Sequence, residues 1–242
     1  MARFFIDKVL GKELIINGHD ATHISRSLRM QIGDEITICD NNAIDYLCII
    51  KKIDKTEVFL KILKSFPCPN EPNIGVTLYQ ALPKSDKMDL IIQKTVELGI
   101  NRIVPVLTKR CVSRPDKNSF DKKLLRWQKI SEEAAKQSRR GRIPKIESLL
   151  NLEDAAKDSC KSQCSMVFYE LHGKKIGDII ENIPKKISLF IGPEGGFSSD
   201  EISMLSSYNV VSATLGRRIL RTETAPIAAL SVIMYETGNL QI

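Results

Sequence analysis

The 242-residue sequence predicts an α/β protein in which a mainly parallel sheet follows a small β-rich domain. From Ile74 onward, short apolar runs alternate with stretches of helical period, which is typical of a parallel sheet with helices on both faces. Residues 1–70 instead contain short apolar-rich runs between turn residues, a pattern typical of strands joined by tight turns. We therefore expect two domains, at residues 1–70 and 74–242.

The first domain is expected to hold one helix among its strands. The expected strands are Arg3–Ile6, Leu14–Ile16, Glu35–Cys39, Ile44–Ile53 and Glu57–Leu63. The helix is expected from about Ala21 to Met30 with Asp20 as its N-cap, since an aspartate can accept hydrogen bonds from the free N–H groups of a first turn. Ser65–Asn73 contains three prolines, which cannot donate ladder hydrogen bonds, so we expect a stiff linker there.

Strands and helices alternate in the second domain. The expected strands are Ile74–Leu82, Arg102–Leu107, Met166–Tyr169, Ile187–Ile191 and Val210–Leu215. The expected helices are Asp86–Leu98, Phe120–Ser138, Leu152–Asp158 and Ile176–Asn182, with one further helix after each of the last two strands. Gly99 is expected to end the first of these helices as a C-cap.

The last two strands are each followed by an elaborate loop. After the first comes Gly192-Pro193-Glu194-Gly195-Gly196, and Ser198 then precedes Glu201 by three residues, the spacing of a capping box. After the second comes L-G-R-R-I-L-R-T-E-T-A, which carries three arginines. Because ligands bind at the carboxyl ends of parallel strands, we expect both loops to lie at such a site.

The two loops favour a ligand site over plain turns. Three glycines within five residues let backbone approach a ligand closely and leave N–H and C=O groups free to read a base such as adenine. The sequence contains neither the phosphate-binding G-x-x-x-x-G-K-[ST] nor the dinucleotide-binding G-x-G-x-x-G. Ordinary tight turns are the alternative for the glycine loop, but the second loop is too long and too polar for a simple turn.

Together the motifs I-G-P-E-G-G-F-S-S-D-E and L-G-R-R-I-L-R-T-E-T-A resemble those of the SPOUT superfamily of RNA methyltransferases, and specifically the bacterial RsmE family. L-R-M-Q-I-G-D-E-I-T-I-C-D resembles that family's N-terminal PUA-like β-barrel domain, and P-K-S-D-K-M-D-L-I-I-Q-K-T-V-E-L-G-I resembles its first methyltransferase helix. The resemblance implies a mainly parallel sheet with a trefoil knot, which chain physics alone would not suggest. It also implies methylation of N3 of a uridine in 16S ribosomal RNA.

The resemblance further implies that three loops hold the cofactor S-adenosyl-L-methionine. V-F-Y-E, which ends at Glu170, lies where the family has the first of these loops. The expected cofactor-binding residues are Tyr169, Glu170, Gly192, Pro193, Glu194, Gly195, Gly196, Leu215, Gly216, Ile219, Leu220, Thr222, Thr224 and Ala225. Uracil N3 becomes anionic as it reacts, and we expect Arg221 to be the cation that stabilises this charge.

Two carboxylates are candidates for the base that takes the N3 proton, Glu194 and Glu223. The alternative for Glu194 is a structural carboxylate that accepts hydrogen bonds from backbone N–H groups at a helix N-terminus. The alternative for Glu223 is a salt bridge to Arg217 or Arg218. Both alternatives stay open at the level of the sequence.

The net charge of +7 is concentrated in one stretch of the chain. Residues 1–72 contain ten basic and ten acidic residues, whereas residues 109–145 contain thirteen basic and four acidic ones. Such a stretch favours a polyanionic partner over a merely solvated helix face, because each neutralised phosphate releases counterions. By resemblance to the family's basic segment and PUA-like domain, the expected RNA-binding residues are Arg3, Arg26, Arg29, Gln137, Arg140 and Arg142.

Several other classes are disfavoured. No apolar run reaches the roughly 18 residues needed to span a bilayer, and the N-terminus lacks the apolar stretch of a signal peptide, so we expect a cytoplasmic protein without membrane contact. The six cysteines are scattered and lack zinc-type spacing, so we expect reduced thiols and no metal. His19 and His23 are four residues apart, but no third ligand lies near them in the sequence.

The resemblance also implies a homodimer. The final helix offers small and apolar side chains for it, although packing within one subunit would use the same ones: Ile227, Ala228, Leu230, Ser231 and Met234. Two alternatives remain for the function. One is a SPOUT enzyme that acts on tRNA or on a ribose 2′-hydroxyl, and the other is a non-catalytic rRNA-binding assembly factor.

Overall fold

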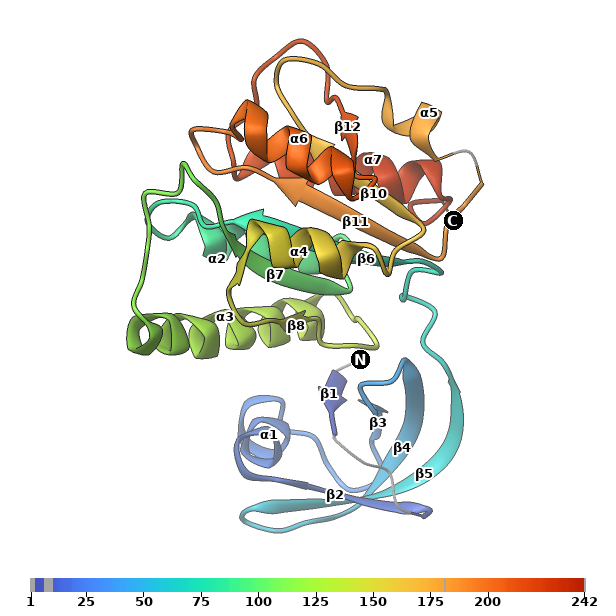
Figure 1. Ribbon diagram of the computed structural model, residues 1–242. Coiled ribbons are helices and arrows are strands. Elements are labelled where there is room, and N and C mark those ends of the chain that lie inside the picture. The colour runs from blue at the N-terminus through green and yellow to red at the C-terminus, as the bar shows by residue number, and fades with distance from the viewer. Residues whose placement is uncertain (1–2, 7–10, 181, 242) are drawn as a thin grey trace. The chain divides into compact units, whose positions relative to one another are not determined.

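The computed structural model of the chain describes residues 3–6, 11–180 and 182–241 (Figure 1). The chain divides into two compact units, one made of residues 1–71 and 135–143 and the other of residues 72–134 and 144–242. Each unit has its own sheet and its own buried core.

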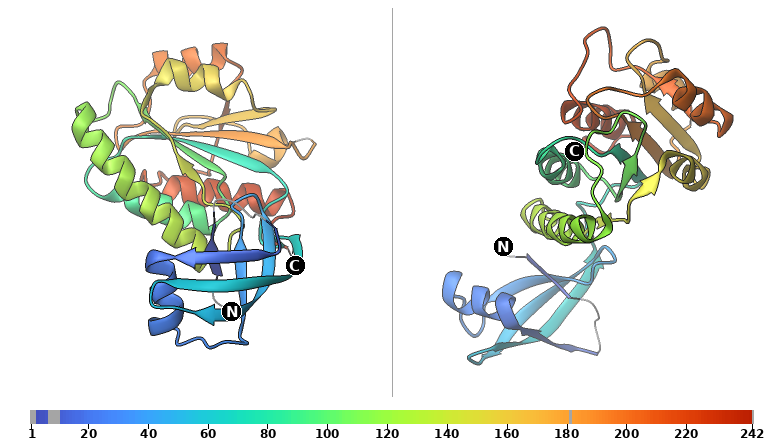
Figure 2. Two further views of the ribbon diagram at one scale, coloured as in Figure 1. Left: turned by 90° about the horizontal axis from the view of Figure 1, so that it is seen from below. Right: turned by 60° about the vertical axis from the view of Figure 1, so that its left-hand side comes forward.

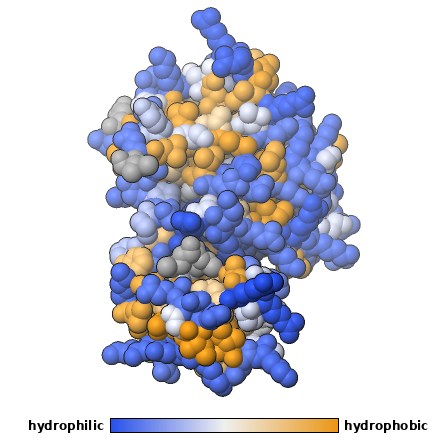
Figure 3. Space-filling view, turned by 180° about the vertical axis from the view of Figure 1, so that it is seen from behind, coloured by the Kyte–Doolittle hydropathy of each residue, from blue (hydrophilic) through white to orange (hydrophobic). Residues whose placement is uncertain are grey.

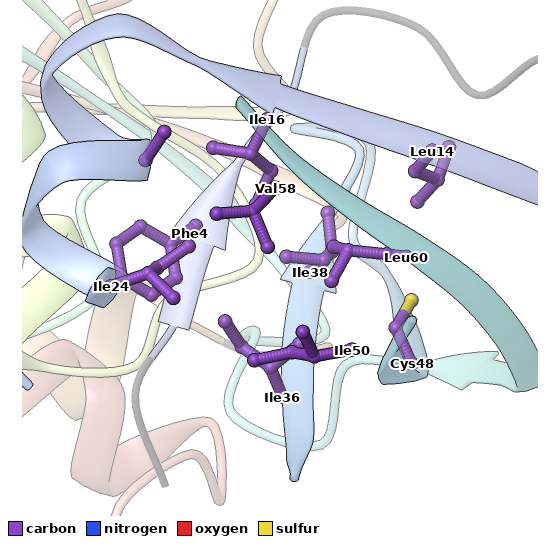
Figure 4. Close-up of a cluster of buried hydrophobic side chains, with 11 residues drawn as sticks. Phe4, Leu14, Ile16, Ile24, Ile36, Ile38, Cys48, Ile50, Val58 and Leu60 are labelled. Carbon is purple, nitrogen blue, oxygen red and sulfur yellow. The ribbon is translucent and has the colours of Figure 1, made fainter. Parts of the chain in front are cut away.

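The first unit is built on a five-stranded sheet with the strand order β1-β3-β4-β5-β2. Its strands are β1 (Arg3–Phe5), β2 (Glu13–Asn17), β3 (Glu35–Cys39), β4 (Ile44–Ile53) and β5 (Glu57–Pro67). β1 pairs with β3 in parallel, and the other neighbouring strands are antiparallel. Side chains alternate along each strand, so those on one face pack together with Ile24 into a closed apolar core (Figure 4).

The helix of this unit differs from the prediction of Ala21–Met30. α1 begins at Gly18 and ends at Thr22, and a π-helical turn, η1, continues from His23 to Ser27. The expected cap at Asp20 is wrong, because Asn17 precedes the helix and its side chain makes no capping bond. The Ser25 hydroxyl donates to the carbonyl of Ala21 at 2.9 Å. Such side-chain bonds compete with regular helical hydrogen bonding and account for the early end of α1.

β5 extends four residues beyond the predicted Leu63. Pro67 pairs with Ile44 at the end of the ladder, where a strand tolerates a residue without an N–H donor. The first three residues of the predicted linker are therefore strand.

The second unit is built on a seven-stranded sheet in which all strand pairs are parallel. The strand order is β12-β10-β11-β6-β7-β8, and β9 also pairs with β7. The strands are β6 (Gly75–Ala81), β7 (Arg102–Leu107), β8 (Lys145–Ile146), β9 (Leu150–Asn151), β10 (Cys164–Phe168), β11 (Lys186–Ile191) and β12 (Val211–Ala213). β8 and β9 were not predicted, because two residues are too few to show the apolar–polar alternation of a strand.

Helices cover both faces of this sheet, as the alternating pattern predicts (Figures 1 and 2). α4 and α6 pack on one face, and α2, α5 and α7 lie on the other. The helices are α2 (Lys87–Glu97), α3 (Lys117–Gln137), α4 (Leu152–Ser159), α5 (Ile176–Ile179), α6 (Ser199–Ser207) and α7 (Thr224–Glu236). α3 begins three residues before the predicted Phe120, since the Asp116 carboxylate accepts the N–H of Ser119 at 2.8 Å.

Two local predictions in this unit have different outcomes. The capping box of α6 is confirmed, with the Glu201 N–H donating to Ser198 Oγ and the Ser198 N–H donating to Glu201 Oε2. The helix predicted over Ile176–Asn182 ends at Ile179, and Glu181 lies outside the described residues.

The strand register brings the two elaborate loops to one edge of the sheet. Phe168, at the end of β10, pairs with Ile191 at the end of β11 and with Ala213 at the end of β12. Ile191 in turn pairs with Gln80 near the end of β6. The segments that follow these four neighbouring strands therefore leave the sheet side by side.

No helix within the described residues is long and apolar enough to cross a membrane. The face of the molecule seen in Figure 3 is mainly polar, with apolar areas interspersed among charged side chains.

Candidate functional site

A pocket of about 430 Å³ opens where β10, β11 and β12 end. Its volume falls within the roughly 300–1,000 Å³ that small-molecule sites occupy. The lining residues are Lys87, Phe168, Tyr169, Glu170, Ile191, Gly192, Pro193, Glu194, Gly195, Gly196, Ala213, Thr214, Leu215, Gly216, Arg217, Arg218, Ile219, Leu220, Arg221, Thr222 and Ala225. All of the residues expected to bind the cofactor therefore line this pocket, except Thr224.

The glycine loop after β11 passes close to the segment after β10. Gly196 has a backbone φ of +63°, which residues other than glycine rarely adopt. A β-carbon at this position would lie 2.9 Å from Glu170 Oε1. The Arg110 guanidinium holds the loop from outside the pocket lining, since its Nη1 donates to the carbonyl of Gly195 at 2.7 Å. No motif in the sequence singles out Arg110.

A buried hydroxyl joins the two loops. Thr222 Oγ1 donates to the carbonyl oxygen of Gly192 at 2.7 Å, and it accepts from Gln80 Nε2 at 3.2 Å. Gln80 is fully buried on β6, and Thr222 is only 6% exposed. Because Gln80 and Thr222 are buried, loss of the hydroxyl would take a partner from a polar group that water does not reach.

The two candidate bases both lie beside one lysine. Lys87 Nζ is 3.0 Å from Glu194 Oε1 and 3.1 Å from Glu223 Oε2. Glu194 Oε1 also accepts the backbone N–H of Lys84 at 3.1 Å. The contact with Glu223 is an ion pair by distance only, because Glu223 Oε2 makes no hydrogen bond within the described residues. Glu194 lines the pocket, whereas Glu223 does not.

This pairing keeps both carboxylates ionised. Burial raises the pKa of Glu194, but hydrogen bonds from Lys87 and from backbone N–H groups outweigh it and place the pKa below its ordinary value. Burial likewise raises the pKa of Glu223, and a backbone N–H, Lys87 and Arg221 together lower it below its ordinary value. A general base works best with a pKa near the working pH, so these shifts do not favour either residue as the base.

The pairing also decides the alternatives posed by the sequence. A salt bridge from Glu223 to Arg217 or Arg218 is wrong, because Lys87 is the cation beside it. The structural alternative for Glu194 agrees with the observed bond from the Lys84 N–H, just before the first turn of α2.

Three arginines of the second loop are exposed and line the pocket: Arg217, Arg218 and Arg221. Within the part of the chain that the structure describes, none of their side chains makes a hydrogen bond or an ion pair. Ile219 between them is 84% exposed. This loop therefore presents positive charge at the pocket, as a site for an anionic partner requires.

The residues expected to bind RNA divide into exposed and buried ones. Arg26, Arg29, Gln137 and Arg142 are exposed. Arg3 is not, since its guanidinium pairs with the buried carboxylate of Asp45, so the expectation that it is exposed is wrong. Arg140 is 2% exposed, and its Nε donates to Glu71 Oε1 at 2.8 Å. These two arginines are committed to the interior of the first unit and are not free to bind phosphate.

Arg139 occupies a position that favours glycine. Its φ is +58°, and the Arg140 N–H after it donates to the carbonyl of Ala135, which closes the end of α3. By resemblance to the family a small residue is expected here, and the left-handed backbone conformation gives the physical reason.

Lys87 and Gln80 were also missed at the level of the sequence. A cation in the first turn of a helix opposes the helix dipole, so the lysine of P-K-S-D-K-M was a signal that carboxylates lie nearby. Gln80 carried no such signal, because a single polar residue in an apolar strand does not reveal its partner.

Comparison with known proteins gives an RNA methyltransferase domain model over residues 70–234 and an RNA methyltransferase PUA domain model over residues 16–63. The chain is 35% identical over 255 aligned positions to ribosomal RNA small subunit methyltransferase E of Bacillus subtilis, covering 100% of this chain and 99% of that protein. It is 34% identical to the protein of the same name from Mesomycoplasma hyopneumoniae, covering 96% of this chain and 98% of that protein.

Among solved structures, the fold is similar to that of ribosomal RNA small subunit methyltransferase E from Neisseria gonorrhoeae bound to S-adenosyl methionine. The TM-score is 0.86 at 30% identity, with 97% of each chain covered. The predicted fold class, a mainly parallel α/β methyltransferase domain preceded by a PUA-like domain, is confirmed.

Proposed function

Because the chain belongs to the family of ribosomal RNA small subunit methyltransferase E, we propose that it methylates 16S ribosomal RNA with S-adenosylmethionine as the methyl donor. The observation that carries this proposal is that both motif loops of the family line one pocket. By resemblance, N3 of a uridine is the acceptor atom, and the enzyme works in the cytoplasm.

The residues of the pocket fit the proposed cofactor. A β-carbon at Gly192 would lie 3.2 Å from the backbone of Gly196, and at Gly195 or Gly196 it would press on the Arg110 or Glu170 side chain. A loop of glycines so closely packed offers N–H and C=O groups that suit the recognition of a flat base. Tyr169 and Glu170 complete the wall from the loop after β10. The apolar side chains of Ile191, Leu215 and Leu220 also line the pocket and can enclose the apolar faces of an adenine.

S-adenosylmethionine, when bound, supplies a methyl group that its sulfonium makes strongly electrophilic. The protein then has to hold the acceptor base in line, let the N3 proton pass to solvent water, and stabilise the negative charge that develops on uracil N3. Positioning of this kind can lower a barrier by as much as roughly 7–11 kcal/mol. Arg221 is the proposed electrostatic group, because it is exposed, lines the pocket and carries a charge that no carboxylate bonds within the described residues.

The exposed basic residues are the proposed contacts to RNA phosphates. They comprise Arg26, Arg29 and Arg142 with the polar Gln137, together with the arginines at the pocket. Contacts of this kind make affinity strongly dependent on salt, since each one releases counterions from the nucleic acid. Arg3 and Arg140 are left out of this proposal because both are buried in ion pairs.

A homodimer through α7 remains part of the proposal. Leu230 and Met234 are buried within the second unit, so they are not available for a partner subunit. Val232 is 38% exposed and Tyr235 is 60% exposed, and Ala228 lies on the same side of the helix at four-residue spacing. This side of α7 offers the apolar surface that a second copy would cover.

Mass spectrometry of nucleosides tests the function. Small-subunit RNA from a deletion strain, incubated with the purified chain and labelled S-adenosylmethionine, should gain one methyl group on a uracil ring. A label on a ribose would favour another SPOUT activity, and so would a label on tRNA in a parallel reaction when small-subunit RNA gains none. Tight RNA binding without any transfer would favour a non-catalytic assembly factor.

A further inference from the structure

Lys87 connects three segments that are distant in the sequence. It is the first residue of α2, and its ammonium lies within 3.1 Å of carboxylates from the loop after β11 and from the N-cap of α7. Each of these carboxylates belongs to, or directly follows, one of the two loops that line the pocket. The lysine itself also lines the pocket.

The position of Lys87 is unfavourable unless its partners are present. A cation at the start of a helix faces the positive end of the helix dipole. The side chain is also partly withdrawn from solvent, at 27% exposure. The Glu194 and Glu223 carboxylates compensate both effects, and with all three groups ionised the cluster carries a net charge of −1, since two negative charges surround one positive charge.

The carboxylates depend on the lysine in the same way. Glu223 Oε2 is buried and accepts no hydrogen bond within the described residues, and the Lys87 ammonium lies within ion-pair distance of it. Lys87 therefore helps to keep this carboxylate in place. Without the ammonium, the two carboxylates would repel one another, and the loops that carry them would move apart.

We propose that Lys87 is a positioning residue whose ammonium holds the Glu194 loop and the start of α7 together, and so preorganises the cofactor pocket between them. The inference rests on the proposed function, because the pocket is taken to bind S-adenosylmethionine. It assigns Glu194 and Glu223 to the support of the pocket, where their carboxylates neutralise Lys87 and do not accept the N3 proton.

The test compares Lys87→Met with Lys87→Arg. Methionine keeps much of the side-chain length without the charge, whereas arginine keeps the charge. By calorimetric titration, Lys87→Met should bind S-adenosylmethionine and S-adenosylhomocysteine about tenfold more weakly, since binding must then order the loops. Lys87→Arg should stay within about threefold of the original chain. Binding by Lys87→Met that equals the original would overturn the inference, and so would equal losses in both variants.

Lys94 provides a matched control on the same helix. Its ammonium pairs with Glu97 at 2.9 Å on the surface of α2, away from the pocket lining. Lys94→Met should therefore leave cofactor affinity unchanged. If it weakened affinity as much as Lys87→Met, the effect would belong to α2 stability and the inference would fail.

A double variant isolates the charge. In the Lys87→Met background, Glu223→Gln removes one of the two repelling carboxylates and should restore part of the lost affinity. The same substitution alone should weaken binding, and additive losses in the double variant would contradict the cluster.

Hydrogen exchange without any ligand separates this inference from the proposed function. Lys87→Met should speed amide exchange in residues 192–196 and 215–223 but not in β2–β5 of the first unit. If the original chain failed to bind S-adenosylmethionine, the proposed function would fall. The exchange pattern would still decide whether Lys87 holds the loops, and unchanged exchange would refute it.

Discussion

The hydroxyl of Thr222 donates a 2.7 Å hydrogen bond to the carbonyl oxygen of Gly192, and this bond joins the two loops that define the pocket. Gln80 Nε2 donates to the same hydroxyl from the neighbouring strand. A threonine of the arginine-rich motif thereby fixes the first glycine of the glycine motif, which explains physically why the two motifs occur together.

Removing this hydroxyl should therefore affect both stability and the pocket. Thr222→Val keeps the shape of the side chain but removes the donor to Gly192 O and one of the two acceptors of Gln80 Nε2, which keeps its bond to the carbonyl of Ala81. The expected cost in folding stability is about 1–3 kcal/mol. Thr222→Ser retains the hydroxyl and should lose much less folding stability than Thr222→Val. Urea denaturation measures the difference, and equal stability of the valine variant would show that the bond contributes little.

Gly196 should not tolerate a side chain. Gly196→Ala places a β-carbon 2.9 Å from Glu170 Oε1 in a left-handed backbone conformation. The Glu170 carboxylate, which lines the pocket, must then move and the loop backbone is strained, so cofactor affinity should fall. Gly238 is the control, because it also has positive φ but a β-carbon there would meet no atom within 4 Å among the described residues. Gly238→Ala should lower folding stability by about 1–2 kcal/mol through backbone strain alone. Its affinity for S-adenosylmethionine, measured by calorimetry, should stay unchanged.

Arg221 should contribute to turnover more than to cofactor binding. In Arg221→Ala, kcat should fall about 10²-fold, the effect expected for one group that stabilises developing charge. Single-turnover methylation of RNA with saturating cofactor measures this rate. Unchanged turnover with intact binding would remove Arg221 from the mechanism.

Two neighbouring arginines should behave oppositely when replaced by alanine. Arg142 is exposed, so Arg142→Ala should weaken RNA binding and reduce the slope of log affinity against log salt by about 1. Arg140 is buried against Glu71, so Arg140→Ala should destabilise the first unit by about 3–5 kcal/mol. Filter binding over a salt series and thermal unfolding separate the two effects, and a stable Arg140→Ala variant would contradict the role assigned to its burial.

Asp158 should make the second unit sensitive to acid. Burial raises the pKa of its carboxyl, but bonds from Lys161, Tyr79 and Arg102 outweigh burial and bring the pKa to about 2. An unfolded aspartate titrates near about 3.9, so the stabilisation is present above about pH 4 and is lost as the pH falls toward 2.

Asp158→Asn should lower the free energy of unfolding by about 2 kcal/mol at neutral pH. On acidification, the stability of this variant should fall less steeply than that of the original chain. Asp121→Asn, at an exposed position of α3, is the control and should follow the original curve. Parallel acid curves for the Asp158 variant and the original chain would contradict the assignment.

The order of elements in the second unit could be predicted because its signals are local. Apolar runs and helical periods lie within single elements, as in Arg102–Leu107, whose bounds agree with the prediction. The capping box at Ser198 is likewise contained in four residues. The shared site followed from one general rule, that the carboxyl ends of parallel strands meet at one edge of the sheet.

The charge pairs could not be predicted, because their partners are far apart in the sequence. Lys87 and Glu223 are brought together only by the fold, as are Arg3 and Asp45, which lie on different strands. The resemblance to the family's PUA-like domain made Arg3 a candidate for RNA contact, and only its buried partner shows that it has a structural role. The π-helical turn at His23–Ser27 was missed for a related reason, since it depends on side-chain bonds and not on apolar spacing.

Calorimetric titration of the purified chain with S-adenosylmethionine tests the central claim most directly. The expected result is one binding site per chain, abolished or strongly weakened by Gly196→Ala and unaffected by Gly238→Ala. A chain that releases no heat with S-adenosylmethionine or S-adenosylhomocysteine, while its thermal unfolding stays cooperative, would contradict the claim that these two loops form a methyl-donor pocket.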